Sequence, residues 1–186
     1  ARNERGKMAF IEKFLQIIPG SNLRKAMDYL NRGDYRRACE HFDRYSSKIE
    51  DISASEEKQE LIRMYMSESY IEYSKSLKAE GKFELAAETL QKVSGLEPEY
   101  SDVHYMLAEL YEKIQREEEA RKSIKQALSV NPNYFIARIF LARLDYISGK
   151  NSNGFEELEK SLSCAPGFYV EKVKNLLLKK LCSKLF

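Results

Sequence analysis

The sequence predicts an all-α solenoid made of paired antiparallel helices. The first indication is a regular spacing, because Pro98, Pro132 and Pro166 recur at equal intervals along the chain. The second is that an aromatic residue follows each proline by two positions. The third is that a small residue precedes each proline by twelve positions: Ala86, Ala120 and Gly154. Agreement of several positions at one such period is typical of stacked helical repeats.

The overall composition supports a folded helical protein and argues against several functions. The 186 residues are 43% hydrophobic and 32% charged, with only four prolines, which is not the composition of a disordered chain. Lys and Arg number 31 against 29 Asp and Glu, so no strong positive excess predicts nucleic-acid binding. No apolar run reaches the roughly 18 residues of a membrane span. Three widely spaced cysteines predict a reducing, cytoplasmic location.

The amino-terminal part holds three predicted elements. A helix over 7–18 ends before a Pro-Gly pair and has the pattern of the second half of a preceding repeat. A first helix pair follows over 21–50. The segment Ser53–Glu56 reads as a capping box. Residues 51–66 should therefore extend the first helix of the next pair and make it longer than its counterparts.

Three further helix pairs are predicted over 67–100, 101–134 and 135–168. In each pair the small residue marks the place where the two helices cross closely, because a bulky side chain there would separate the backbones. Gly81 and Gly149 occupy the turn between the helices in two of the pairs. A left-handed backbone at such a turn favours glycine.

A closing helix is predicted over 169–185. Its leucines and valines alternate with five lysines, a pattern typical of an amphipathic helix. Such a helix covers the apolar face that the last repeat of a solenoid would otherwise expose.

The recurring positions resemble the tetratricopeptide repeat family, most clearly in the unit 101–134. Its matching residues are Leu107, Ala108, Tyr111, Ala120, Ile124, Ala127 and Pro132. The unit 21–50 follows the same order of small and aromatic residues, at Ala26, Tyr29, Gly33, Tyr35, Ala38 and Phe42. Leu77 and Asp145 depart from the family pattern, which usually has Tyr there. The resemblance implies one domain over 1–186, a right-handed α-solenoid of about four helix pairs with an extra helix at each end.

The residues that enzymes use are not clustered in this sequence. His41 and His104 lie in different repeats, outside any zinc-binding spacing. His104 stands where the family often has Trp, which favours a packing role. Cys39 is two positions from His41, hence on a different face of one helix, and no glycine-rich phosphate loop is present. The sequence therefore predicts a protein that is not an enzyme and has no metal, cofactor or small-molecule substrate.

A partner-binding site is predicted on the first helices of the repeats. In helical solenoids these helices line the inner, concave surface, and the family resemblance assigns particular positions of each unit to that groove. The residues expected to bind a partner are Lys75, Tyr105, Met106, Glu109, Ile136, Ile139, Phe140, Arg143, Tyr146 and Ile147. Four of them, Ile136, Ile139, Phe140 and Ile147, lie on the helix that begins at 135, whose packing face is already filled. Either the closing helix or a partner should therefore cover them.

The predicted function is non-catalytic binding of a peptide or helix of another protein in this groove. Some family members hold a carboxyl-terminal peptide with a clamp of lysines, asparagines and an arginine. That clamp is absent here, because its asparagine positions hold Lys75, Met106 and Phe140. One alternative is a homo-oligomeric scaffold whose terminal helices engage other copies. The others are a peripheral membrane adaptor that uses the lysine-rich helix 169–185, and an accessory module of a larger enzyme.

Overall fold

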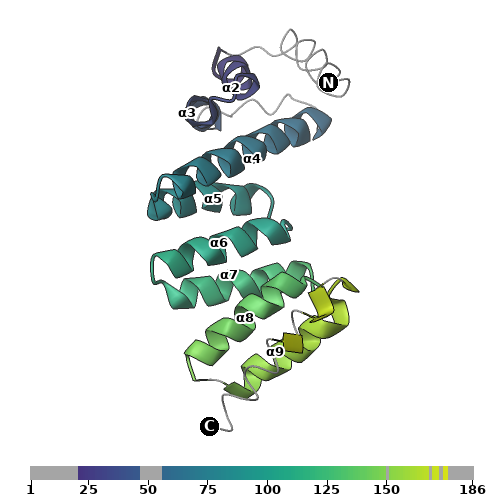
Figure 1. The fold of residues 1–186 in the computed structure, drawn as a ribbon. Helices are drawn as coiled ribbons and strands as arrows, with labels where there is room; N and C mark the ends of the chain where they lie inside the picture. Colours follow the sequence, from purple (N-terminus) through teal and green to yellow (C-terminus); the bar gives the residue numbers. More distant parts are fainter. Residues whose placement is uncertain (1–20, 47–55, 150, 168, 172–173, 176–186) are drawn as a thin grey trace. The chain divides into compact units, whose positions relative to one another are not determined.

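The computed structural model describes residues 21–46, 56–149, 151–167, 169–171 and 174–175, and all regular secondary structure in these ranges is helical (Figure 1). The prediction of an all-α protein built from helix pairs is confirmed. The predicted helix 7–18, the first three residues of the capping box and most of the closing helix lie outside the described residues.

The chain divides into two compact units, Ala1–Glu97 and Pro98–Phe186. In the first unit, α2 (Ser21–Asn31) pairs with α3 (Tyr35–Ser46), and α4 (Glu56–Ala79) pairs with α5 (Phe83–Leu96). The helix α4 has 24 residues, against 13 in α6 and in α8. The core of this unit is formed by large buried side chains: Leu23, Met27, Phe42, Tyr70, Leu77, Leu90 and Val93.

The second unit repeats the same arrangement. Here α6 (Ser101–Lys113) pairs with α7 (Glu117–Val130), and α8 (Phe135–Ile147) pairs with α9 (Asn151–Cys164) (Figure 1). Its buried apolar side chains include Val103, Leu107, Leu110, Ile124, Leu141, Leu144 and Leu158. Because the pair α6 and α7 packs against the pair α8 and α9 through α7 and α8, α6 and α8 become neighbours through their side chains.

The small residues that recur before each proline lie where the two helices of a pair cross. A Cβ atom added to Gly154 of α9 would lie 2.9 Å from the carbonyl oxygen of Ala142 in α8. In the pair α4 and α5, the hydroxyl of Ser74 donates a hydrogen bond of 2.9 Å to the carbonyl of Ala86. Backbone carbonyls therefore approach the partner helix at both crossings, and a larger side chain has no room there.

The turn within each described pair uses a left-handed residue. Gly81 and Gly149 have φ of 76° and 77°, as glycine at a helix end often does. The equivalent position of the pair α6 and α7 holds Gln115, with φ of 60°. The backbone N–H of Arg116 nevertheless donates to the carbonyl of Tyr111 at 2.8 Å, just as Lys82 donates to Leu77 at 2.9 Å. The hydrogen bonds of the turn are thus kept without the glycine.

Candidate partner-binding site

Three aromatic rings join α6 to α8 in the second unit. The Tyr105 ring centroid lies 5.8 Å from that of Phe140, with the rings edge to face at 75°. It also lies 5.5 Å from the ring centroid of Tyr134, in the turn before α8. Aromatic pairs with this geometry contribute about 0.5–1.5 kcal/mol beyond the burial of their surfaces. The cluster therefore fixes the first helices of these two repeats side by side.

Phe140 is a buried residue, although the sequence placed it in an exposed groove. Only 5% of its surface is exposed. The Tyr105 ring packs against it, and the guanidinium carbon of Arg143 lies 4.7 Å from the Phe140 ring centroid. The additional cover expected for this side chain thus comes from α6 and from its own helix. A polar substitution at Phe140 would disturb packing as well as any partner contact.

Arg143 forms a charged bridge from α8 to α6. Its Nη2 atom lies 2.6 Å from Oε2 of Glu112, and the same guanidinium lies over Phe140. Glu112 was not among the residues expected to bind a partner. Opposite charges at neighbouring groove positions of consecutive repeats were the signal that could have identified it.

Three large side chains of α8 remain open to solvent on this side. Ile147 is 66% exposed, Ile136 is 39% exposed and Tyr146 is 38% exposed. Ile139 and Met106 are half-buried. We call this surface of the second unit the α6–α8 face; it comprises Asp102, Tyr105, Met106, Glu109, Glu112, Lys113, Ile136, Ile139, Arg143, Tyr146 and Ile147. The remaining expected residue, Lys75, is exposed on α4 in the first unit and pairs with Glu72 at 2.6 Å.

The tyrosine hydroxyls of the α6–α8 region are held protonated. Burial raises the pKa of Tyr105 to about 12, helped by the charge of Glu109 and by the hydrogen bond that the hydroxyl donates to it. Burial likewise raises the pKa of Tyr134, whose hydroxyl donates to Asp102. Both phenols therefore act as neutral donors to carboxylates at any ordinary pH.

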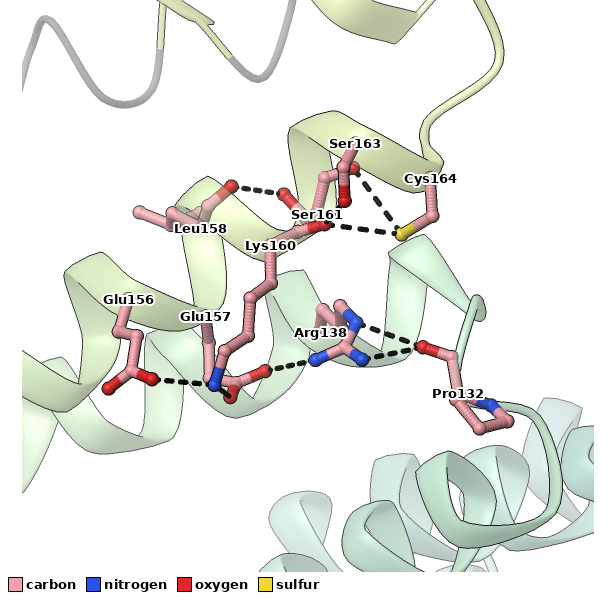
Figure 2. A network of polar contacts seen from close by, with 9 residues as sticks. All are labelled: Pro132, Arg138, Glu156, Glu157, Leu158, Lys160, Ser161, Ser163 and Cys164. Atoms are coloured by element: carbon pink, nitrogen blue, oxygen red, sulfur yellow. Dashed lines mark hydrogen bonds and ion pairs between the residues drawn. The ribbon is translucent and has the colours of Figure 1, made fainter.

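The end of α8 near Pro132 is fixed by Arg138. Figure 2 shows its guanidinium between the carbonyl of Pro132 and the carboxylate of Glu157 on α9. Nε and Nη2 donate to Pro132 at 3.0 and 2.6 Å, and Nη1 lies 2.8 Å from Glu157. Arg138 and Glu157 are both largely buried, so these bonds are stronger than surface ion pairs. The helix that carries the exposed isoleucines is thus anchored on its opposite side.

A second buried ion pair joins α7 to α8. Arg121 of α7 donates to the carboxylate of Asp145, and the two side chains are only 9% and 8% exposed. Its Nη2 atom also donates to the hydroxyl of Ser148 at 2.8 Å and to Glu117 at 3.2 Å. Asp145 occupies a position where the family pattern has Tyr, and this pairing gives the departure a physical reason. The sequence alone gave no sign that Arg121 would be its partner.

The first unit contains a cleft that the sequence did not predict. It has a volume of about 560 Å³ and lies between the turn that follows α2 and the turn that follows α4. Its walls include Arg32, Tyr35, Tyr73, Lys82 and Leu85. Arg32 lies 3.9 Å from Asp28 and Lys82 lies 2.7 Å from Glu80. These two cations of the cleft are therefore paired with carboxylates of their own unit.

The residues that the sequence considered for catalysis are dispersed in the structure. Burial raises the pKa of the Cys39 thiol to about 12, which leaves it an unreactive thiol. His104 is buried, and its Nε2 atom lies 2.8 Å from the carbonyl oxygen of Pro98. Among the described residues, no three His, Cys, Asp or Glu side chains converge as a metal site would require. In those same ranges, no helix has both the length and the apolar character to cross a bilayer.

The fold and the α6–α8 face define a protein of stacked helix pairs with an exposed apolar and charged surface on its first helices. Residues 77–144 match the family model described as tetratricopeptide repeat. Over this segment the resemblance to tetratricopeptide repeats that the recurring positions predicted is confirmed. Comparison with curated protein sequences gives no match.

Solved structures with the same fold come from several proteins. The second tetratricopeptide domain of human RPAP3, in complex with the HSP70 peptide SGPTIEEVD, is 24% identical, with a TM-score of 0.53 over 60% of this chain and 98% of that one. The type III secretion translocator chaperone SycD of Yersinia enterocolitica is 13% identical, with a TM-score of 0.60 over 68% and 98%. The MamA protein is 18% identical, with a TM-score of 0.55 over 89% and 99%. These similarities establish the fold.

Proposed function

We propose that this chain is a non-catalytic interaction module that binds a segment of a partner protein on the α6–α8 face. The observation that carries the proposal is the exposure of Ile136, Tyr146 and Ile147 on one side of α8. The opposite side of this helix is filled by buried residues and anchored by Arg138. Covering each exposed isoleucine contributes about 1.5–3 kcal/mol at most. Since these side chains are 66% and 39% exposed, a partner that covers both gains about 1.5–3 kcal/mol in total, a minor but specific part of the roughly 8 kcal/mol of a micromolar complex.

Proteins with the same fold support this proposal at the level of the class. The second RPAP3 domain was solved with an HSP90 peptide and with an HSP70 peptide, and SycD is a chaperone of secretion translocators. Both RPAP3 ligands end in Glu-Glu-Val-Asp. The α6–α8 face carries carboxylates of its own, and Met106 and Phe140 replace two asparagines of the clamp. We therefore propose a different kind of peptide for this chain.

Self-association and membrane attachment depend on the predicted helices 7–18 and 169–185. Most of these residues lie outside the described part of the chain, and no feature of the α6–α8 face favours either alternative specifically. The dispersed histidines and the buried cysteine described above give no support to a catalytic role. Partner binding is accordingly the function that we propose.

The proposal is tested by affinity capture from a cell extract with the wild-type chain and the variant Ile136→Gln/Ile147→Gln. Both positions are exposed, so the variant should keep the circular dichroism spectrum of the wild type. We expect a protein captured by the wild type to be at least about tenfold depleted with the variant, because two apolar contacts are lost. The captured protein is quantified by mass spectrometry.

The matched control is Leu85→Gln/Val130→Gln, which removes two side chains of similar exposure, 43% and 38%, from other surfaces. It should capture the same proteins as the wild type. Equal capture by all three chains would show that the α6–α8 face is not the binding site. Recovery of this chain alone would instead favour the homo-oligomeric scaffold.

A further inference from the structure

The α6–α8 face has an acidic stripe along α6. Asp102, Glu109 and Glu112 are separated by seven and three positions, a spacing that places them on one side of the helix. The apolar side chains of α8 lie beside this stripe, since Tyr105 contacts Phe140 and Glu112 contacts Arg143. The face therefore combines an apolar strip with a row of carboxylates.

The positive charges of the face are few. Arg143 is already engaged by Glu112 at 2.6 Å and by the ring of Phe140. Lys113 lies at the carboxyl end of α6, where the helix dipole favours a cation. Three carboxylates against these two cations leave an excess of one negative charge. This excess lies toward the amino-terminal half of the stripe, at Asp102 and Glu109.

The hydrogen bonds at Asp102 and Glu109 do not remove this charge. Tyr134 donates to Asp102 and Tyr105 donates to Glu109, and both donors are neutral hydroxyls. The charge of Glu109 also contributes to the raised pKa of each tyrosine. Two separate phenols in this region thus experience a negative environment.

We propose that the partner segment recognised by the α6–α8 face is cationic and amphipathic, with Lys or Arg facing Asp102 and Glu109 and apolar side chains covering Ile136, Tyr146 and Ile147. This inference rests on the proposed function and adds the chemistry of the partner. An acidic segment on the same apolar strip would bring its charges against the carboxylates of α6, which disfavours it. The charge of the face thus selects among segments that the apolar strip alone would accept.

Two synthetic amphipathic peptides test the inference against the full chain. They share one pattern of leucines and differ only in carrying Lys or Glu at every polar position. Fluorescence anisotropy gives the dissociation constant at low and at high salt. We expect the Lys peptide to bind at least about tenfold more tightly than the Glu peptide, with the preference reduced at high salt.

Variants of the chain show which carboxylates cause the preference for the Lys peptide. Glu109→Gln and Asp102→Asn should each weaken binding of the Lys peptide by about 1.5–5-fold, the range of exposed ion pairs. Glu119→Gln removes an exposed carboxylate of α7 and should change nothing. Ile136→Gln/Ile147→Gln should weaken binding without altering its dependence on salt.

The outcomes separate the two proposals. If the Glu peptide binds as tightly and Ile136→Gln/Ile147→Gln abolishes binding, the face is a docking site and the charge inference is wrong. If the isoleucine variant binds both peptides like the wild type, the location on the α6–α8 face is wrong as well. Equal losses in Glu119→Gln and Glu109→Gln, or no binding of either peptide, would also overturn the inference of a cationic partner.

Discussion

A single residue, Gln115, occupies a backbone conformation that the neighbouring repeats give to glycine. Its φ is 60°, and Gly81 and Gly149 hold the same position in the preceding and the following repeat. This conformation costs a residue with a Cβ atom about 1 kcal/mol. We therefore expect Gln115→Gly to raise the free energy of unfolding by about 0.5–1 kcal/mol, measured by urea denaturation.

The reverse change provides the control. Gly149→Ala places a Cβ at a left-handed position with open space around it, so only the backbone strain is added. It should lower the free energy of unfolding by a similar amount, about 1 kcal/mol. A Gln115→Gly variant that is less stable than the wild type would show that the Gln115 side chain makes contacts that outweigh the strain.

At the scale of residues, the sequence predicted which residue types recur at each repeat position. It predicted less well which side chains surround a given residue. The position of Gly154 followed from the period, and the packing role of His104 followed from the family resemblance. The burial of Phe140 did not, because it depends on Tyr105 and Arg143, which approach it only after two repeats have packed. The same holds for Arg121, whose partner Asp145 lies on the next helix. A contact between side chains of two different repeats leaves no recognisable pattern in the sequence of either repeat.

The pairing of α8 with α9 depends on the absence of a side chain at Gly154. A methyl group there would approach the Ala142 carbonyl to 2.9 Å, closer than such atoms normally come. In an ordinary helix, Gly→Ala stabilises by about 0.8–1 kcal/mol. Here we expect Gly154→Ala to destabilise by about 1–3 kcal/mol, because the two backbones must separate. Thermal unfolding followed by circular dichroism measures the change.

Gly95, near the end of α5, is the matched control. It lies in a helix with no atom near the added Cβ, so Gly95→Ala should leave stability unchanged or raise it by up to about 1 kcal/mol. If both substitutions raise the unfolding temperature, the crossing of α8 and α9 has room that the structure does not indicate.

At the scale of elements, the helices could be predicted from the sequence. The proline period marks where each helix pair ends, and the small residues mark where its two helices cross. The irregular element is α4. Its length follows from residues between the first two helix pairs that fit no repeat, and the sequence identified them by their misfit with the period. The contacts of Arg138 were not accessible, because they link α8 to the carbonyl of Pro132 and to α9. The contact of Arg143 with Glu112 had a weak signal, the opposite charges at neighbouring positions of two repeats.

For the whole molecule, buried and half-buried tyrosines make stability depend on alkaline pH. The pKa of Tyr70 is raised by burial and by its bond to Asp43 in the first unit, and those of Tyr105 and Tyr134 are raised in the second. A pKa raised on folding means that this stability is complete below the unfolded value of about 10. It is lost as pH rises towards and beyond the folded values, of which that of Tyr105 is about 12.

We therefore expect helix content to fall cooperatively above about pH 10, together with ionisation of the buried tyrosines. Circular dichroism and the absorbance of phenolate follow the two events in one titration. Tyr105→Phe should move the transition to higher pH, and Tyr100→Phe, at an exposed position, should not. Ionisation of all tyrosines while the helices persist would contradict this expectation.

The buried pair of Arg121 and Asp145 bears on how such a chain can grow or shrink by whole repeats. If the unit 101–134 were duplicated in tandem, the residue meeting Arg121 would be a copy of Tyr111, which holds the position of Asp145 in the preceding repeat. The guanidinium of the first copy would then lose its buried carboxylate partner and keep only the half-exposed Glu117, at a cost of up to about 3–5 kcal/mol. Repeats that look interchangeable by their period are therefore not interchangeable at this junction. The ion pair of Arg121 and Asp145 therefore constrains the order of the last two repeats.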